Sequence, residues 1–232
     1  MKLKQLFFAL ALLVLANVNL NAQDSDSSNC AKYKTLYYQY LKQDMYRDAM
    51  TFWQMAYNYC GYDSLQARFF SNGRIGYLKL IDIETDSVKK LALRDSLYWI
   101  HECLIIKDPN PDWKGKYASM LVTDGDKRFG KIDSLFLNSV HVMKSESSPT
   151  YIRQYFKHLI VNKYNAAAAE KKDEVRGFVI EEYMILTDYC TAGAKNKRAA
   201  AATLPAEDEK KATLEEDAKK YEGAQEFMDK YL

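Results

Sequence analysis

Two apolar stripes with helical spacing lie close together near the start of the chain, and they restrict the fold more than any other feature. In each stripe the apolar side chains recur every three or four residues, and the polar stretch 42–44 separates the two. The stripes consist of Tyr33, Leu36, Tyr37, Tyr40 and Leu41, followed by Tyr46, Ala49, Met50, Trp53, Ala56 and Tyr57. This pattern predicts a helical hairpin. Neither helix can bury its stripe alone, so we expect the hairpin to stack on further helices.

Large and small residues follow one another in a characteristic order along this hairpin. Ala49 and Ala56 would let two helices approach closely, and the large ring of Trp53 stands between them. The full set of such positions is Tyr33, Leu36, Tyr40, Tyr46, Ala49, Trp53 and Ala56. Over about one repeat, this order resembles the tetratricopeptide repeat. Tyr37 departs from the family, which has a small residue there, and Gly61 stands where proline is usual. An ordinary amphipathic hairpin of an unrelated bundle is the alternative.

Further helical hairpins are predicted along the rest of the chain. The sequence has only 9 glycines and 4 prolines and no clear alternating apolar pattern, which favours an all-α fold over a sheet. We expect hairpins over residues 63–109, 111–144 and 148–194. In the first of them, the spacing of Ala49, Phe52, Trp53 and Ala56 returns in Ser96, Trp99, Ile100 and Cys103. The sequence therefore predicts an α-solenoid of stacked, tetratricopeptide-like hairpins over residues 30–194.

A linker and a terminal helix are expected after these hairpins. Gly193 is a natural helix stop, and the basic and alanine-rich stretch 195–204 is predicted to be a linker. Residues 205–232 are predicted to form a charged amphipathic helix, with acidic residues four positions before lysines. Its narrow apolar seam contains Leu214, Ala218, Tyr221, Ala224, Phe227, Met228 and Tyr231. This seam suits either docking on the preceding hairpin or pairing with another chain, so a homo-oligomer formed through the terminal helix is one hypothesis.

The first residues have the pattern of a secretory signal peptide. Two lysines precede an apolar run over residues 6–16, and cleavage is expected after Ala22. We predict a signal peptide over residues 1–22, a flexible mature N-terminus over residues 23–29, and export to the periplasm or the outer membrane without membrane insertion after cleavage. The Asn-Ala-Gln ending resembles that of exported proteins of Bacteroidota. An uncleaved anchor is the alternative, although the apolar run is shorter than the roughly 20 residues that a spanning helix needs.

The chain has 4 cysteines, and an exported protein can form disulfides. Cys30 precedes the first helix of the leading hairpin, and Cys60 ends the second. These two ends lie side by side in an antiparallel hairpin, so we predict a disulfide between Cys30 and Cys60, worth about 3–4 kcal/mol on the chain-entropy model. Cys103 falls at a small-residue position and is expected to be a buried thiol. Cys190 has no predicted partner.

The sequence contains no convincing catalytic or metal-binding pattern. A net charge of +2 gives no reason to expect a nucleic-acid or acidic-membrane partner. No glycine-rich phosphate loop is present. His101 is two residues from Cys103, so the two side chains point in different directions on a helix, and His141 and His158 have no second ligand four residues away. We therefore predict that the protein is not an enzyme and has no cofactor or metal.

The family resemblance implies a function in binding. Tetratricopeptide repeat proteins bind peptides or protein surfaces in a concave groove lined by the first helix of each hairpin. Carried over to this chain, the groove candidates are Lys34, Tyr37 and Gln39. The chain also has 18 tyrosines, whose polar tips suit peptide binding where they face a groove. The expected function is an exported, non-enzymatic protein–protein interaction module, an adaptor or scaffold of the bacterial cell envelope. The alternatives are a self-assembling structural subunit and a ligand-binding protein or enzyme.

Overall fold

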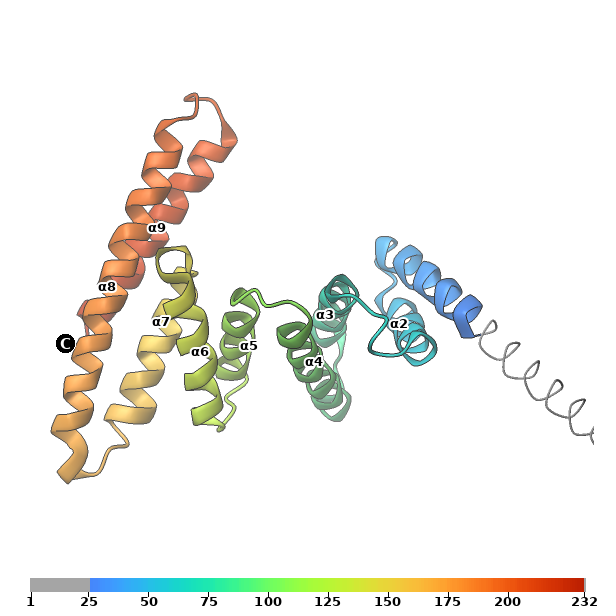
Figure 1. The fold of residues 1–232 in the computed structure, drawn as a ribbon, viewed down its shortest axis with the longest axis horizontal. Coiled ribbons are helices and arrows are strands. Elements are labelled where there is room, and N and C mark those ends of the chain that lie inside the picture. The colour runs from blue at the N-terminus through green and yellow to red at the C-terminus, as the bar shows by residue number, and fades with distance from the viewer. Residues whose placement is uncertain (1–25, 232) are drawn as a thin grey trace, which may run out of the picture. The chain divides into compact units, whose positions relative to one another are not determined.

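The computed structural model describes residues 26–231, and all regular secondary structure within them is helical (Figure 1). The first helix is described over residues 26–42. It is followed by α2 (Tyr46–Cys60), α3 (Ala67–Ile83), α4 (Ser87–Lys107), α5 (Asp112–Thr123), α6 (Phe129–Met143), α7 (Pro149–His158), α8 (Lys172–Ala202) and α9 (Glu209–Asp229). The all-α class predicted by the periodicity and the scarcity of glycine and proline is thus confirmed.

The N-terminal predictions fall partly outside this range. The predicted signal peptide, residues 1–22, lies outside the described residues, as do residues 23–25. Residues 26–29, which the sequence predicts to be flexible, belong instead to the first helix. Within residues 26–231, none of the helices combines the length and the apolar character that crossing a membrane requires.

The chain forms two compact units, which meet in the sequence between Asp108 and Pro109. We call them unit 1 and unit 2. The single repeat domain predicted over residues 30–194 is therefore divided. Helix α4 ends at Lys107, and Pro109 follows directly after the boundary. Proline cannot donate a backbone hydrogen bond and disfavours helical backbone in the residue before it, so a continuous helix cannot run from one unit into the next.

The leading hairpin of unit 1 is held at its open end by a disulfide. Cys30 of the first helix and Cys60 of α2 are joined, with their Cα atoms 4.9 Å apart. This is the pair that the hairpin geometry predicts. On α2, the buried residues are Ala49, Met50, Trp53 and Ala56, which belong to the second apolar stripe of the sequence. The stripe therefore faces the interior, as its spacing indicates.

Helix α3 approaches α2 closely because two glycines lie at the contact. A Cβ atom at Gly73 would lie 2.6 Å from the indole ring of Trp53, and one at Gly76 would collide with the sulfur of Met50. Both glycines are buried within α3. A larger residue at either position would push the two helices apart, so the rings of α2 can pack against α3 only because these side chains are missing.

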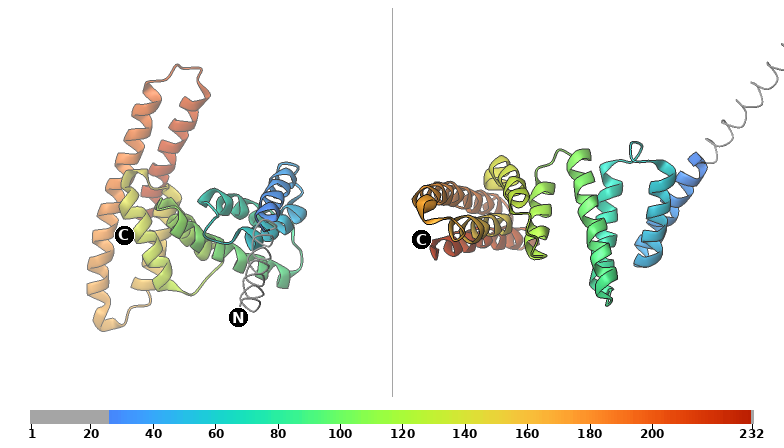
Figure 2. Two further views of the ribbon diagram at one scale, coloured as in Figure 1. Left: turned by 45° about the vertical axis from the view of Figure 1, so that its right-hand side comes forward. Right: turned by 90° about the horizontal axis from the view of Figure 1, so that it is seen from below.

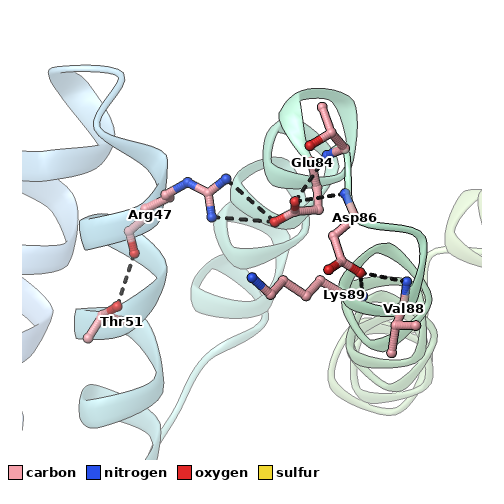
Figure 3. A network of polar contacts seen from close by, with 7 residues as sticks. Arg47, Thr51, Glu84, Asp86, Val88 and Lys89 are labelled. Carbon is pink, nitrogen blue, oxygen red and sulfur yellow. Dashed lines mark hydrogen bonds and ion pairs between the residues drawn. The ribbon is translucent and has the colours of Figure 1, made fainter.

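A polar cluster joins the start of α2 to the turn between α3 and α4 (Figure 3). The guanidinium of Arg47 donates to Glu84 over 3.4 Å, and Glu84 also accepts from the backbone N–H groups of Thr85 and Asp86 at 3.0 and 3.1 Å. Asp86 in turn caps α4 by accepting from the backbone N–H groups of residues 88 and 89. These backbone hydrogen bonds lower the pKa of both carboxyl groups. The cluster satisfies helix-end donors that would otherwise lack partners.

Unit 2 is dominated by the long pair α8 and α9, which lie side by side in all three ribbon views (Figures 1 and 2). The predicted seam of the terminal helix is largely buried within the unit, at Ala218, Tyr221, Ala224 and Met228. Helix α9 packs against both α8 and α7. Of the two uses that the sequence leaves open for the seam, docking on the preceding helices is therefore the one observed.

The predicted helix stop at Gly193 and the predicted linker 195–204 are both wrong. Helix α8 continues through them to Ala202. Gly193 is buried, and a Cβ atom there would lie 2.6 Å from the ring of Tyr221 on α9. The glycine thus makes room for a neighbouring ring and does not end the helix. The alanines that follow it have the highest helix propensity of all residues, so the local sequence favours continuation.

The hydroxyl of Tyr221 forms hydrogen bonds that hold its ring against Gly193. It donates to the backbone carbonyls of Ser145 and Ser147, each over 2.9 Å. These residues belong to the connection between α6 and α7, which contains a short 3₁₀ helix (Lys144–Glu146). After α7, a π-helical turn (Leu159–Tyr164) ends the helix. One tyrosine therefore ties the terminal helix to a loop distant in sequence.

Candidate functional site

The three predicted groove residues do not form a site together. Tyr37 is completely buried, whereas Lys34 is half-buried and Gln39 is exposed. The ring of Tyr37 packs against those of Tyr38 and Phe69, with centroids 4.9 and 5.9 Å apart. Burial, with a smaller contribution from Tyr38, raises the pKa of Tyr37. The prediction that Tyr37 lines an open groove is therefore corrected: its large ring fills the interior at the position where the repeat family has a small residue.

Unit 1 instead carries a hollow on the side of its second helices. This hollow measures about 450 Å³. We call it the aromatic hollow. It is lined by Trp53, Gln54, Tyr57, Asn58, Tyr77, Asp95, Ser96 and Trp99. The lining comes from α2, α3 and α4, so the hollow lies wholly inside unit 1.

Helical periodicity explains how these side chains come together. On α2, Trp53 and Tyr57 are four residues apart and therefore share a face. On α4, Asp95 and Trp99 have the same spacing. Tyr77 of α3 lies between these two faces, because α3 contacts both α2 and α4. The side chains from α2, α3 and α4 thus come together in one hollow only when the three helices pack.

Four aromatic rings line the hollow; three pairs of them meet at nearly right angles, and Trp53 and Tyr57 are nearly parallel at 12°. The ring of Trp99 is almost perpendicular to that of Tyr57, at 88° with centroids 5.0 Å apart, and to that of Trp53, at 79° and 6.2 Å. The ring of Tyr77 is perpendicular to that of Trp53, at 90° and 5.9 Å. Trp53 and Tyr77 are buried, Tyr57 is half-buried, and Trp99 is 37% exposed. The hollow therefore has a buried aromatic floor and an exposed aromatic rim.

Some polar groups that line the hollow already have hydrogen-bond partners within the chain. The amide of Gln54 donates to the hydroxyl of Tyr77 over 2.9 Å, and the hydroxyl of Ser96 donates to the backbone of its own helix. Trp53 donates its indole N–H to the carbonyl of Phe69 over 3.1 Å. Within residues 26–231, the carboxylate of Asp95 makes neither a hydrogen bond nor an ion pair. The hollow therefore offers a negative charge that the described chain does not neutralise.

Sequence reasoning missed this hollow because it placed the groove on the first helices. A usable signal was nevertheless present. In the repeated spacing, Trp99 takes the position of Phe52, next to the core position held by Ile100. A tryptophan beside the core stripe, with Asp95 one turn before it, indicates an aromatic side chain at the rim of a surface.

Unit 2 contains an acid–base pair that the sequence did not connect. The imidazole Nε2 of His141 on α6 lies 2.9 Å from a carboxylate oxygen of Glu182 on α8, and its Nδ1 lies 3.5 Å from the hydroxyl of Tyr189. The Glu182 side chain is 8% exposed. Burial, followed by the charge of Glu182, raises the pKa of Tyr155. With its carboxylate and Tyr155 both buried, the arrangement is suited to linking α6, α7 and α8 and offers no accessible nucleophile.

A second polar pair, a buried histidine and a half-buried aspartate, joins α6 to α7. The imidazole Nε2 of His158 and the ammonium of Lys163 each lie 2.9 Å from an oxygen of Asp133. The amide of Asn162 lies 2.9 Å from the other ring nitrogen of His158. Burial opposes ionisation of Asp133, but the contacts with His158 and Lys163 outweigh it and lower the pKa of the carboxyl group. These contacts tie α6 to α7 and to the π-helical turn that follows α7.

Metal binding and cysteine chemistry find no support in the described part of the chain. Among residues 26–231, no three histidine, cysteine, aspartate or glutamate side chains gather in a way that could hold a metal ion. Cys103 and Cys190 are buried free thiols, and burial raises their pKa values to about 11 and about 12. A thiol with so high a pKa carries almost no thiolate near neutral pH and is a poor nucleophile.

In comparisons with known proteins, no family model, no curated protein and no solved structure matches this chain. The class of protein therefore follows from the structure itself. It is an all-helical protein of two units, the first of which carries a hollow with aromatic walls and an unneutralised carboxylate.

Proposed function

We propose that this chain is an exported, non-enzymatic protein–protein interaction module of the bacterial cell envelope, and that it binds a partner polypeptide in the aromatic hollow. The observation that carries the proposal is the rim of the hollow, where Trp99 is 37% exposed beside the half-buried ring of Tyr57. Tryptophan and tyrosine are the residues most enriched among those that dominate protein-binding energy, because they combine a large apolar face with a polar atom.

A solenoid of the tetratricopeptide type is the architecture that we propose for unit 1. Its first four helices form two consecutive hairpins, and the small positions Ala49 and Ala56 are fully buried. Trp53 stands between them in the core, and Gly73 and Gly76 allow α3 to approach α2. These are the features that hairpin stacking needs. The departure at Tyr37 changes the packing of the first helix without removing the hairpin.

Export is supported by the pairing of Cys30 with Cys60. Disulfides persist in oxidising compartments such as the bacterial periplasm and are rare in the cytosol. Together with the signal-like pattern of residues 1–22, this pairing favours a location outside the cytoplasm.

The self-assembly alternative has less support. It relies on the apolar seam of the terminal helix, and Ala218, Tyr221, Ala224 and Met228 of that seam are buried against the chain's own helices. A second copy would have to displace α8 or use another face of α9. An interaction through the hollow requires no such rearrangement.

Site-specific photo-cross-linking in the native host tests the proposal. A photoreactive amino acid is placed at Asn58, on the wall of the hollow, and in a matched protein at Lys79, an exposed position of α3 that does not line it. We expect a protein adduct from position 58 that is absent from position 79. Adducts of the same size and yield from both positions, or none from position 58, would contradict the proposal.

The variant Trp99→Ala provides the control within the same experiment. Because Trp99 lies at the rim and is partly exposed, its removal should leave unit 1 folded while abolishing the adduct at position 58. Retention of that adduct at full yield would show that the partner does not use the rim.

A further inference from the structure

We propose that the aromatic hollow receives a cationic side chain, lysine or arginine, of the partner polypeptide. This inference rests on the proposed function, since it assumes that a polypeptide binds there. Beyond that function, it specifies which class of partner side chain the hollow binds.

The walls of the hollow offer ring faces to a cation. The face of an aromatic ring carries partial negative charge, and a cation within about 6 Å of the ring centre is attracted to it, most strongly by tryptophan. Trp99 and Tyr57 meet at 88° with their centroids 5.0 Å apart, and Trp53 and Tyr77 form the floor beneath them. In the corner between two perpendicular rings that touch edge to face, an ammonium or guanidinium group can approach the face of each ring.

Asp95 supplies a full negative charge at the same place. It lines the hollow one helical turn before Trp99, and among residues 26–231 no cation pairs with it. A partner that covered the hollow with an apolar side chain would remove this carboxylate from water without compensation, which costs free energy. An acidic side chain would add repulsion. A cation is the one class of side chain that both the rings and the carboxylate favour.

No basic side chain among residues 26–231 fills this role. None of the eight lining residues is lysine or arginine. Elsewhere in the described residues, cations do lie over rings, as Lys107 does over Tyr62 at 4.0 Å and Lys116 over Trp113 at 4.3 Å. The described part of the chain thus has cation–aromatic contacts at other places and none over the rings of the hollow.

Selection from a randomised peptide library on the immobilised protein tests the inference. The bait proteins are the unmodified chain, Asp95→Asn, Trp99→Leu, and Asp82→Asn as the matched control. Asp82 is an exposed aspartate of α3 outside the hollow, so its replacement makes the same charge change on the same unit. We expect the unmodified chain and the control to select peptides rich in lysine or arginine. Their binding should weaken about tenfold or more on Asp95→Asn and on Trp99→Leu.

Other outcomes would contradict either the cationic group or peptide binding in the hollow as a whole. Peptides that depend on Trp99 but show no preference for basic residues, and no loss on Asp95→Asn, would refute the cation and leave the proposed function standing. Basic peptides that are lost equally on Asp82→Asn would refute it as general charge attraction. If no selected peptide depends on Trp99, both the inference and peptide binding in the hollow fail.

Discussion

Unit 1 and unit 2 are both helical, but their interiors are built from different chemistry. In unit 1 the interior centres on Trp53, whose ring contacts those of Tyr57, Phe69, Phe70, Tyr77 and Trp99. In unit 2, imidazole–carboxylate contacts join the helices, with Glu182 against His141 and Asp133 against His158, whereas the buried carboxyl of unit 1, Glu84, pairs with Arg47 beside a turn. Unit 1 should therefore depend mainly on ring volume and on its disulfide, and unit 2 on close helix contacts and ionisation.

This difference explains why the candidate site lies in unit 1. The carboxylates of Asp133 and Glu182 in unit 2 are engaged in contacts with its own helices. In unit 1 the aromatic interior continues to the surface at Trp99, next to a carboxylate without a partner among the described residues. A surface that is to bind another molecule must retain such unsatisfied groups.

Replacement of Trp53 by alanine should give the largest effect and break the aromatic interior. Trp53 is 2% exposed, and truncation of a buried tryptophan costs about 3–5 kcal/mol of unfolding free energy. Urea unfolding followed by circular dichroism measures the loss. The control is Trp99→Ala, which should lose less because that ring is 37% exposed. Equal losses of unfolding free energy in the two variants would show that Trp99 is a core residue. It would then not form an exposed rim of the hollow.

Removal of the disulfide should destabilise unit 1 alone. The double variant Cys30→Ser with Cys60→Ser opens a crosslink between residues 30 positions apart and should cost about 3–4 kcal/mol. Tryptophan fluorescence can separate the units, since Trp53 and Trp99 lie in unit 1 and Trp113 in unit 2. We expect the Trp113 transition, isolated in a variant with phenylalanine at the other two positions, to stay unchanged. A shift of that transition would show that the two units unfold together.

The variant Gly193→Ala tests the close contact of unit 2. A Cβ atom at this position would lie 2.6 Å from the ring of Tyr221, so we expect a loss of about 1–3 kcal/mol. The matched control is Gly177→Ala in the same helix, where a Cβ atom meets nothing within 4 Å. That variant should gain about 0.5–1 kcal/mol, because alanine favours the helix over glycine. Thermal unfolding of the two variants should therefore shift in opposite directions.

Acid should weaken unit 2 through Asp133, and this is the smallest effect that we expect. The contacts with His158 and Lys163 lower the pKa of Asp133 in the folded state. A carboxyl group with a lowered folded pKa contributes stability above its unfolded pKa of about 3.9, and this contribution is lost as the pH falls through the folded pKa. Urea unfolding from about pH 6 downwards, followed through Trp113, measures it.

Asp133→Asn is the control for this pH dependence. It removes the titrating group and should make unfolding less dependent on pH in the acid range, while lowering stability near neutral pH. An unchanged acid dependence would assign the loss of stability to other carboxyl groups. The groups that face Asp133 are His158, Lys163 and Tyr155.

Features that depend on neighbouring residues along the chain were predictable. The spacing of Ala49, Met50, Trp53 and Ala56 predicts the buried face of α2, and the polar stretch 42–44 marks the turn before it. The disulfide was predictable as well, because the two ends of one antiparallel hairpin must meet. Helical periodicity and hairpin closure are local properties, so a single sequence contains them.

Features that depend on contacts between distant segments were not predictable. Tyr37 could be assigned to the groove because nothing local reveals that Phe69 covers it, and Gly193 looks like a helix stop until Tyr221 is placed against it. The pairing of His141 with Glu182 likewise joins two helices far apart in the chain.

The helical class, the hairpins and the cysteine pair can be derived from the order of residues along the chain. Helix packing, in contrast, brings the rings of Trp99 and Tyr57 together above Trp53, beside the carboxylate of Asp95. Helix formation follows from the spacing of residues within a few turns, whereas this surface requires side chains from α2, α3 and α4 to meet. That meeting depends on how closely whole helices can approach, and here Gly73 and Gly76 permit it.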